Sequence, residues 1–71
     1  MDEHTFSAFN DLWKLWKDNQ KIANDAKAWE HVSAAVEKIW NDAPEARDPQ
    51  FIREFCLSVI SSLHRINMDK N

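Results

Sequence analysis

Glycine and tyrosine are absent from the 71-residue sequence, and proline occurs only twice. Glycine supplies the positive φ angles of tight hairpin turns, so its absence argues against a β-rich fold. A glycine-rich phosphate-binding loop is excluded for the same reason. The sequence therefore predicts helices joined by short polar links. In a chain of this length it predicts one domain, residues 1–71.

The only cysteine, Cys56, excludes an internal disulfide and gives no indication of secretion. The first residues, MDEHTFS, do not combine a basic segment with an apolar run, and no apolar run approaches the roughly 18 to 20 residues of a membrane span. The net charge is -3, with acidic and basic residues interleaved and no basic stripe. We therefore expect a cytoplasmic protein that binds neither a membrane nor, directly, nucleic acid.

The strongest helix signal lies near the end of the chain. Asp48 is a typical N-cap residue, and Pro49 suits the first helical position because its missing N–H needs no partner there. Apolar residues then recur at helical spacing on one side, namely Phe51, Ile52, Phe55, Cys56, Val59, Ile60, Leu63 and Ile66. The pattern predicts a helix over residues 49–67.

Two further helices are expected upstream. Thr5 is the expected N-cap of a helix over residues 5–20, and a second helix covers residues 25–41. Pro44 ends the second helix, whereas no glycine or proline marks the end of the first, so a true turn between the two is left open. Short links favour antiparallel packing of neighbouring helices. The expected fold is all-α, a compact three-helix bundle with frayed ends at 1–4 and 68–71.

The first helix carries more apolar surface than contact with two neighbours requires. Phenylalanine, leucine and tryptophan fill about half of its circumference, whereas a core-facing stripe is nearer 100° wide. The predicted core consists of Phe9, Trp13, Trp29, Val36, Ile39, Ile52, Phe55, Val59 and Leu63. The surplus is either further core or a contact edge, whose predicted partner-binding residues are Leu12, Leu15, Trp16 and Leu57. Exchanging Leu12 and Leu15 together for Glu should then abolish association and leave the helices intact.

No arrangement of residues indicates catalysis. Cys56 lies on an apolar helix side, and His64 projects roughly 80° away from it, so the pair does not form a nucleophile with its base. The three histidines lack a second His or Cys three or four positions away, which is the usual spacing of metal ligands on a helix. We therefore expect no catalytic, cofactor-binding or metal-binding residue and no small-molecule substrate. The protein is expected not to be an enzyme.

Three segments carry a resemblance to a known group of proteins. They are FNDLWKLWK near the start, AWEHVSAAVEKI in the middle and FIREFCLSVISSLHR near the end. Their order resembles short uncharacterised helical proteins encoded by phages and mobile elements of Gram-positive bacteria, and the resemblance covers most of the chain. It implies a small accessory protein in a bacterial cytoplasm that acts against a host or defence protein, with no binding residue to carry over.

The function predicted first is a non-enzymatic protein-protein interaction module, with a homodimer as one candidate form. The alternative is a mildly acidic inhibitor that occupies the nucleic-acid-binding surface of a partner protein. A small DNA-binding regulator comes third, because the link before the last helix is too long for a helix-turn-helix and that helix offers few basic residues. Salt separates the first two, since an electrostatic complex weakens with ionic strength and an apolar one barely responds.

Overall fold

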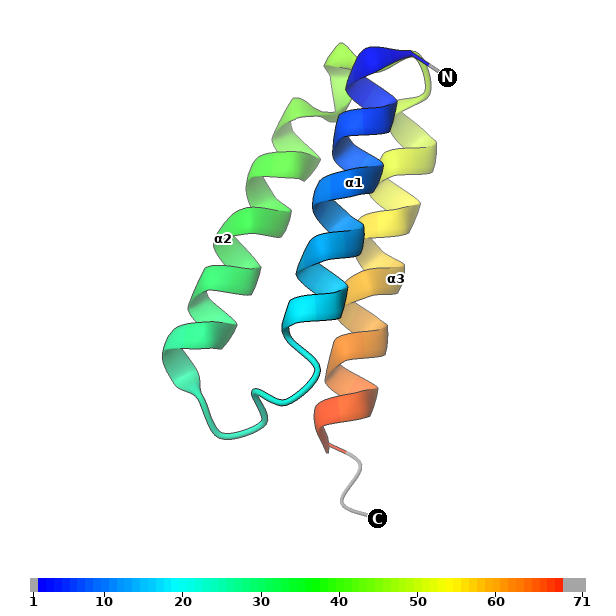
Figure 1. Ribbon diagram of the computed structural model, residues 1–71. Coiled ribbons are helices and arrows are strands. Elements are labelled where there is room, and N and C mark those ends of the chain that lie inside the picture. The colour runs from blue at the N-terminus through cyan, green and yellow to red at the C-terminus, as the bar shows by residue number, and fades with distance from the viewer. Residues whose placement is uncertain (1, 69–71) are drawn as a thin grey trace.

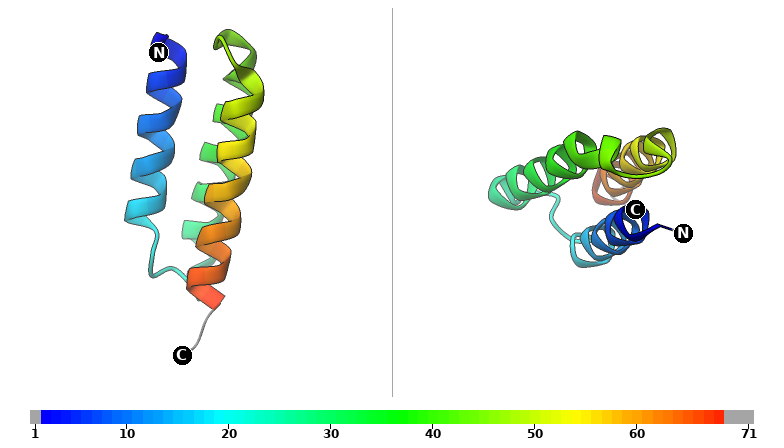
Figure 2. Two further views of the ribbon diagram at one scale, coloured as in Figure 1. Left: turned by 90° about the vertical axis from the view of Figure 1, so that its right-hand side faces the viewer. Right: turned by 90° about the horizontal axis from the view of Figure 1, so that it is seen from above.

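The computed structural model describes residues 2–68, and three long helices form an up-down-up bundle (Figure 1). Helix α1 spans Glu3–Asp18, α2 spans Ala26–Asp42 and α3 spans Pro49–Met68, with a short 3-10 helix, η1, at Ala43–Glu45. Helices α1 and α3 run side by side in the same direction, and α2 runs against both (Figure 2). The expected all-α three-helix bundle is confirmed. None of the helices within residues 2–68 is long and apolar enough to cross a membrane.

Each long helix begins at an aspartate whose carboxylate accepts a hydrogen bond from the backbone N–H three residues further on. The distances are 3.1 Å for Asp2, 3.0 Å for Asp25 and 3.2 Å for Asp48. Such caps satisfy N–H groups that have no partner inside the helix. The predicted start of α3 at Asp48 and Pro49 is thus confirmed, because the aspartate caps the helix and the proline needs no N–H partner.

The predicted start of α1 at Thr5 is wrong. Thr5 is a buried residue of the first turn, and its hydroxyl donates to the Asp2 carboxylate at 2.6 Å. That bond lowers the pKa of the Asp2 carboxyl below its ordinary value. Residues 3 and 4 are helical rather than frayed, because Asp2 caps the helix ahead of them. Met68, also expected to be frayed, is the last residue of α3. The remaining residues of the expected frayed ends, 1 and 69–71, lie outside the described residues.

A true turn separates α1 from α2. It contains no glycine, and hydrogen bonds from side chains stabilise it. No residue between 2 and 68 has a positive φ angle. The side-chain amides of Asn19 and Gln20 donate to the carbonyl oxygens of Leu15 and Trp16, both at 2.7 Å. These carbonyls belong to the last turn of α1, which offers them no intrahelical partner. Helix α1 therefore ends at Asp18, two residues before the predicted boundary.

Asn67, near the end of α3, fastens this turn to the bundle. Its side chain is buried, and its Oδ1 accepts a hydrogen bond from the backbone N–H of Ile22 at 2.6 Å. Its Nδ2 donates to the carbonyl oxygens of Asn19 at 3.1 Å and of Leu63 at 2.9 Å. The Ile22 side chain is thereby held in the core, a position that the sequence pattern did not indicate.

Replacing Asn67 by alanine should lower the free energy of unfolding by about 2 kcal/mol, because the buried N–H of Ile22 and the carbonyl of Asn19 lose their partner. Urea denaturation followed by circular dichroism measures the change. Asn41→Ala, at an exposed position of α2, is the matched control and should change the free energy by less than about 0.5 kcal/mol. Equal effects of the two substitutions would show that Asn67 does not hold the turn.

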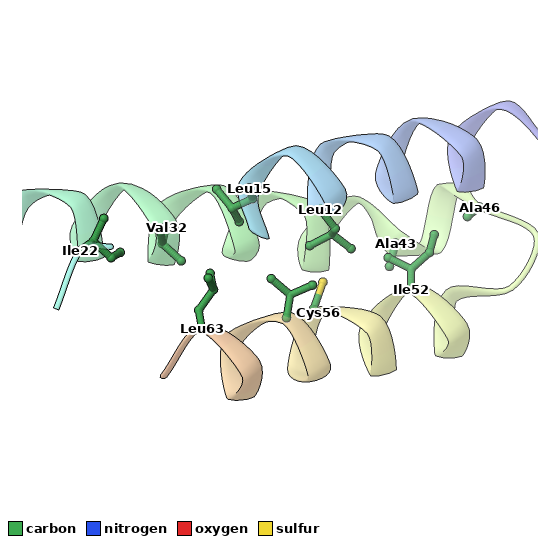
Figure 3. Close-up of a cluster of buried hydrophobic side chains, with 10 residues drawn as sticks. Leu12, Leu15, Ile22, Val32, Ala43, Ala46, Ile52, Cys56 and Leu63 are labelled. Carbon is green, nitrogen blue, oxygen red and sulfur yellow. The ribbon is translucent and has the colours of Figure 1, made fainter. Parts of the chain in front are cut away.

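Aliphatic residues and one cysteine fill the interior of the bundle (Figure 3). The largest fully buried side chains are those of Leu12, Val32, Cys56 and Leu63. The other buried apolar residues are Leu15, Ile22, Ala43, Ala46, Ile52 and Val59. Helices packed with axes 8–10 Å apart leave room at the centre for aliphatic side chains, and broad rings fit better at the rim.

The predicted core is confirmed for α3 and wrong for α1. Ile52, Val59 and Leu63 are buried, and Trp29, Val36, Ile39 and Phe55 are partly buried against the core. Phe9 and Trp13 are instead 41% and 46% exposed, at the outer edge of the contact between α1 and α3. The interior side of α1 is occupied by leucine instead.

Candidate functional site

Aromatic side chains gather along the line where α1 meets α3. The ring centroids of Phe9 and Phe55 are 5.2 Å apart, and those of Phe51 and Phe55 are 6.3 Å apart. The rings of Trp13 and Trp16 are stacked with centroids at 5.5 Å. These separations are typical of interacting rings. The surface is named the aromatic face, and its residues are Phe6, Phe9, Trp13 and Trp16 of α1 with Phe51 and Phe55 of α3.

Four of the six rings are substantially open to solvent. The exposed fraction is 58% for Phe6, 41% for Phe9, 46% for Trp13 and 40% for Phe51. Trp16 and Phe55 are partly buried against the core. Contiguous apolar patches of several hundred Å² on a small protein commonly mark a binding site. The aromatic face therefore meets the first requirement of a partner surface.

A hollow of about 250 Å³ opens within this face, between α1 and α3. Trp13, Trp16 and Phe55 line it together with two small residues, Ser58 and Ser62, and with Val59, which is buried. The indole Nε1 of Trp16 donates to Ser62 Oγ at 2.9 Å, which fixes the position of that ring. The lining includes no charged residue and no residue of α2. The hollow is thus an apolar recess between α1 and α3.

The structure does not bring the four predicted partner-binding residues together. Leu12 and Leu15 are 0% and 8% exposed, so their assignment to a contact edge is wrong. Trp16 lies at the aromatic face and lines the hollow. Leu57 is 60% exposed, but it lies beside Ser61 and Arg65 and lines no part of the apolar hollow.

The orientation of α1 explains why Leu12 and Leu15 lie in the core and not at a contact edge. The apolar half-circle of α1 is wider than the buried side of the helix, so the pattern alone permits either flank to face inward. The side of α1 with the smaller apolar residues, Leu12, Leu15 and the partly buried Ala8, faces the core. The aromatic side lies at the edge of the contact with α3. One signal on α3 indicated this edge. Phe51, Phe55, Ser58 and Ser62 recur at helical spacing, which places rings and small residues in one row.

Cys56 and His64, considered above as a reactive pair, lie in different surroundings. Cys56 is fully buried, and burial raises the pKa of its thiol, which disfavours the nucleophilic thiolate. The ring of His64 lies 6.3 Å from that of Trp29, on the exposed surface. Within residues 2–68, no group of three or more His, Cys, Asp or Glu residues could hold a metal ion. The aromatic face is therefore the candidate site that the arrangement favours.

By its fold the protein is a small three-helix bundle, and its most distinctive surface is an exposed aromatic one. No protein-family model, no curated protein and no solved structure matches the chain. The geometry of the aromatic face is therefore the basis for inferring a function.

Proposed function

We propose that the protein is a non-enzymatic interaction module that binds a protein partner through the aromatic face. The main support is that the buried cluster consists of aliphatic residues and one cysteine, whereas Phe6, Phe9, Trp13 and Phe51 stay 40–58% exposed. Aromatic residues are enriched at the centres of protein interfaces, where they supply large area at little entropic cost. A bundle that does not require these rings for its own core can use them for binding.

The shape of the surface favours one mode of binding. Helices α1 and α3 run in the same direction and enclose the apolar hollow between them, which resembles the grooves that accept amphipathic helices. A partner helix would place an apolar side chain in the hollow and cover the flanking rings. Because the lining is uncharged, the affinity would come from apolar burial and would change little with salt. The partner predicted from the sequence is either a host or defence protein or a second copy of the chain.

Trp13→Gln should abolish capture of the partner. The test compares the immobilised wild-type chain with this variant in a native lysate of the source cells. The substitution removes one wall of the hollow at a position that is 46% exposed, so the helical signal in circular dichroism should be unchanged. Leu57→Gln is the matched control, because it also exchanges an exposed apolar residue of a long helix for glutamine. Wild type and Leu57→Gln should retain the same proteins, and Trp13→Gln should lose them.

Two results would count against the proposal. Retention of the same proteins by all three chains would show that the aromatic face does not bind them. Release of the retained proteins at moderate salt would favour the predicted alternative, an acidic inhibitor recognised through its charge, because an apolar contact persists at high ionic strength.

A further inference from the structure

We propose that the aromatic face binds a second copy of the same chain, so that the protein forms a homodimer in which the two aromatic faces cover each other. This inference rests on the proposed function, since it names the partner of the same surface. Three features of the face support it: its area, its combination of protruding rings with a hollow, and the absence of charge at its centre.

The area agrees with what a dimer of this size needs. A phenylalanine or tryptophan side chain has a surface of about 150–250 Å². The exposed fractions of Phe6, Phe9, Trp13 and Phe51 therefore leave on the order of 400 Å² of ring surface accessible. A standard interface buries roughly 800 Å² on each partner, and about 65% of a homodimer interface is apolar. The exposed rings thus supply most of the apolar area that one half of such an interface requires.

The face is also complementary to itself. A two-fold interface uses the same patch on both copies, so that patch must contain both the protruding and the receding parts. Phe6 and Trp13 are the most exposed rings, and the hollow beside Ser58 and Ser62 is the receding part. At about 250 Å³ the hollow has room for an aromatic side chain of the other copy.

The register of α1 against α3 places these parts at the same height. Phe9 lies beside Phe55 and Trp16 beside Ser62, so each residue of α1 lies level with the residue 46 positions later in α3. Trp13 is therefore level with Val59 and next to Ser58. In a dimer whose two-fold axis runs parallel to the helices, α1 of each copy lies over α3 of the other. Trp13 of one copy then covers the hollow of the other, and Phe9 meets Phe55.

Electrostatics does not oppose this contact. A two-fold contact brings the charges of the interface near copies of themselves or of their neighbours, so like charges at the centre of the patch would repel. The hollow is lined by three aromatic rings, two serines and one valine, without any charged residue. The charged side chains of α1 near this level are exposed and absent from the lining, namely Asp11, Lys14, Lys17 and Asp18. The centre of the face can therefore close against a second copy.

Light scattering after size exclusion tests the dimer directly, over a wide range of protein concentration. Wild type should show a mass approaching twice the 8.4 kDa of one chain at high concentration. Ser58→Lys fills the hollow from an exposed position and should raise the dissociation constant at least tenfold. Ser33→Lys places the same change on an exposed position of α2, outside the face, and should alter the dissociation constant less than twofold. Circular dichroism should show the same helical content for all three chains.

The possible failures are distinguishable. A wild-type chain that stays monomeric at millimolar concentration would overturn the homodimer. The proposed function would survive that result if the Trp13→Gln variant still lost lysate proteins that wild type retained. A dimer weakened equally by Ser58→Lys and Ser33→Lys would overturn the assignment of the aromatic face as its interface.

Discussion

Replacing Leu12 by alanine should lower the free energy of unfolding by about 3 kcal/mol, measured by urea denaturation followed by circular dichroism. Leu12 is fully buried in the interior, where its side chain belongs to the same cluster as Val32, Cys56 and Leu63. The substitution removes the transfer free energy of the deleted carbon atoms and leaves a cavity that a small core cannot fill. Domains of about this length have a total stability of roughly 4–10 kcal/mol. The loss should therefore bring the chain near its unfolding threshold.

The control for this experiment is Leu57→Ala. It deletes the same atoms at a site that is 60% exposed, and it should change the free energy of unfolding by less than about 0.5 kcal/mol. The double exchange of Leu12 and Leu15 for glutamate should unfold the chain, which reverses the expectation drawn from the sequence. A folded, helical double variant would contradict the buried position of both leucines.

The start of α3 and the link after α2 could be predicted from local signals in the sequence. Asp48 and Pro49 define the start of α3 through a side-chain cap and a missing N–H, both of which act within one turn. Pro44 marks the link after α2, because proline cannot continue an α-helix. The structure has a short 3-10 helix there. Such signals depend on neighbouring residues, so they do not require knowledge of the packing.

The orientation of α1 could not be predicted in this way. Its apolar residues span half of the circumference, and only the positions of α2 and α3 decide which of them face inward. Leucine faces the interior and tryptophan lies at the edge because the space between the helices fits the smaller side chain. The spacing of apolar residues does not contain this information. The contact of Asn67 with Ile22 is likewise long-range, since it joins residues 45 positions apart. The sequence therefore predicts an excess of apolar surface on α1, and of the four predicted partner-binding residues only Trp16 lies on the aromatic face.

The division between the two sides of α1 would allow so small a domain to separate its stability from the proposed binding. Leu12 and Leu15 hold the helix to the core, and Phe6 and Trp13 project from the same helix into solvent. Substitutions on the first side should change the free energy of unfolding, and substitutions on the second should change association. This separation allows the effect of Trp13→Gln to be interpreted as a change in binding, and the exposed position of Ser58 on α3 allows the same for Ser58→Lys.

Cys56 should react with an aromatic disulfide reagent at least about a thousandfold more slowly in the folded chain than in urea, because its thiol becomes accessible only when the bundle opens. Burial also raises the pKa of the thiol, so the reactive thiolate is disfavoured before opening. The measurement is the absorbance of the released thiolate at fixed pH. Leu12→Ala should accelerate the reaction about a hundredfold, since a loss of about 3 kcal/mol corresponds to roughly two factors of ten in the open population.

An exposed cysteine in the same helix gives the reference rate. Ser61→Cys combined with Cys56→Ala places the thiol five positions further along α3, at an exposed site outside the aromatic face, and it should react nearly as fast as in urea. If Cys56 of the folded wild type reacted as quickly as this reference, α3 would open locally without global unfolding. The buried cluster of Leu12, Cys56 and Leu63 would then not be the cooperative core of the protein. A slow reaction that Leu12→Ala accelerates would instead show that the same core protects the thiol and stabilises the fold.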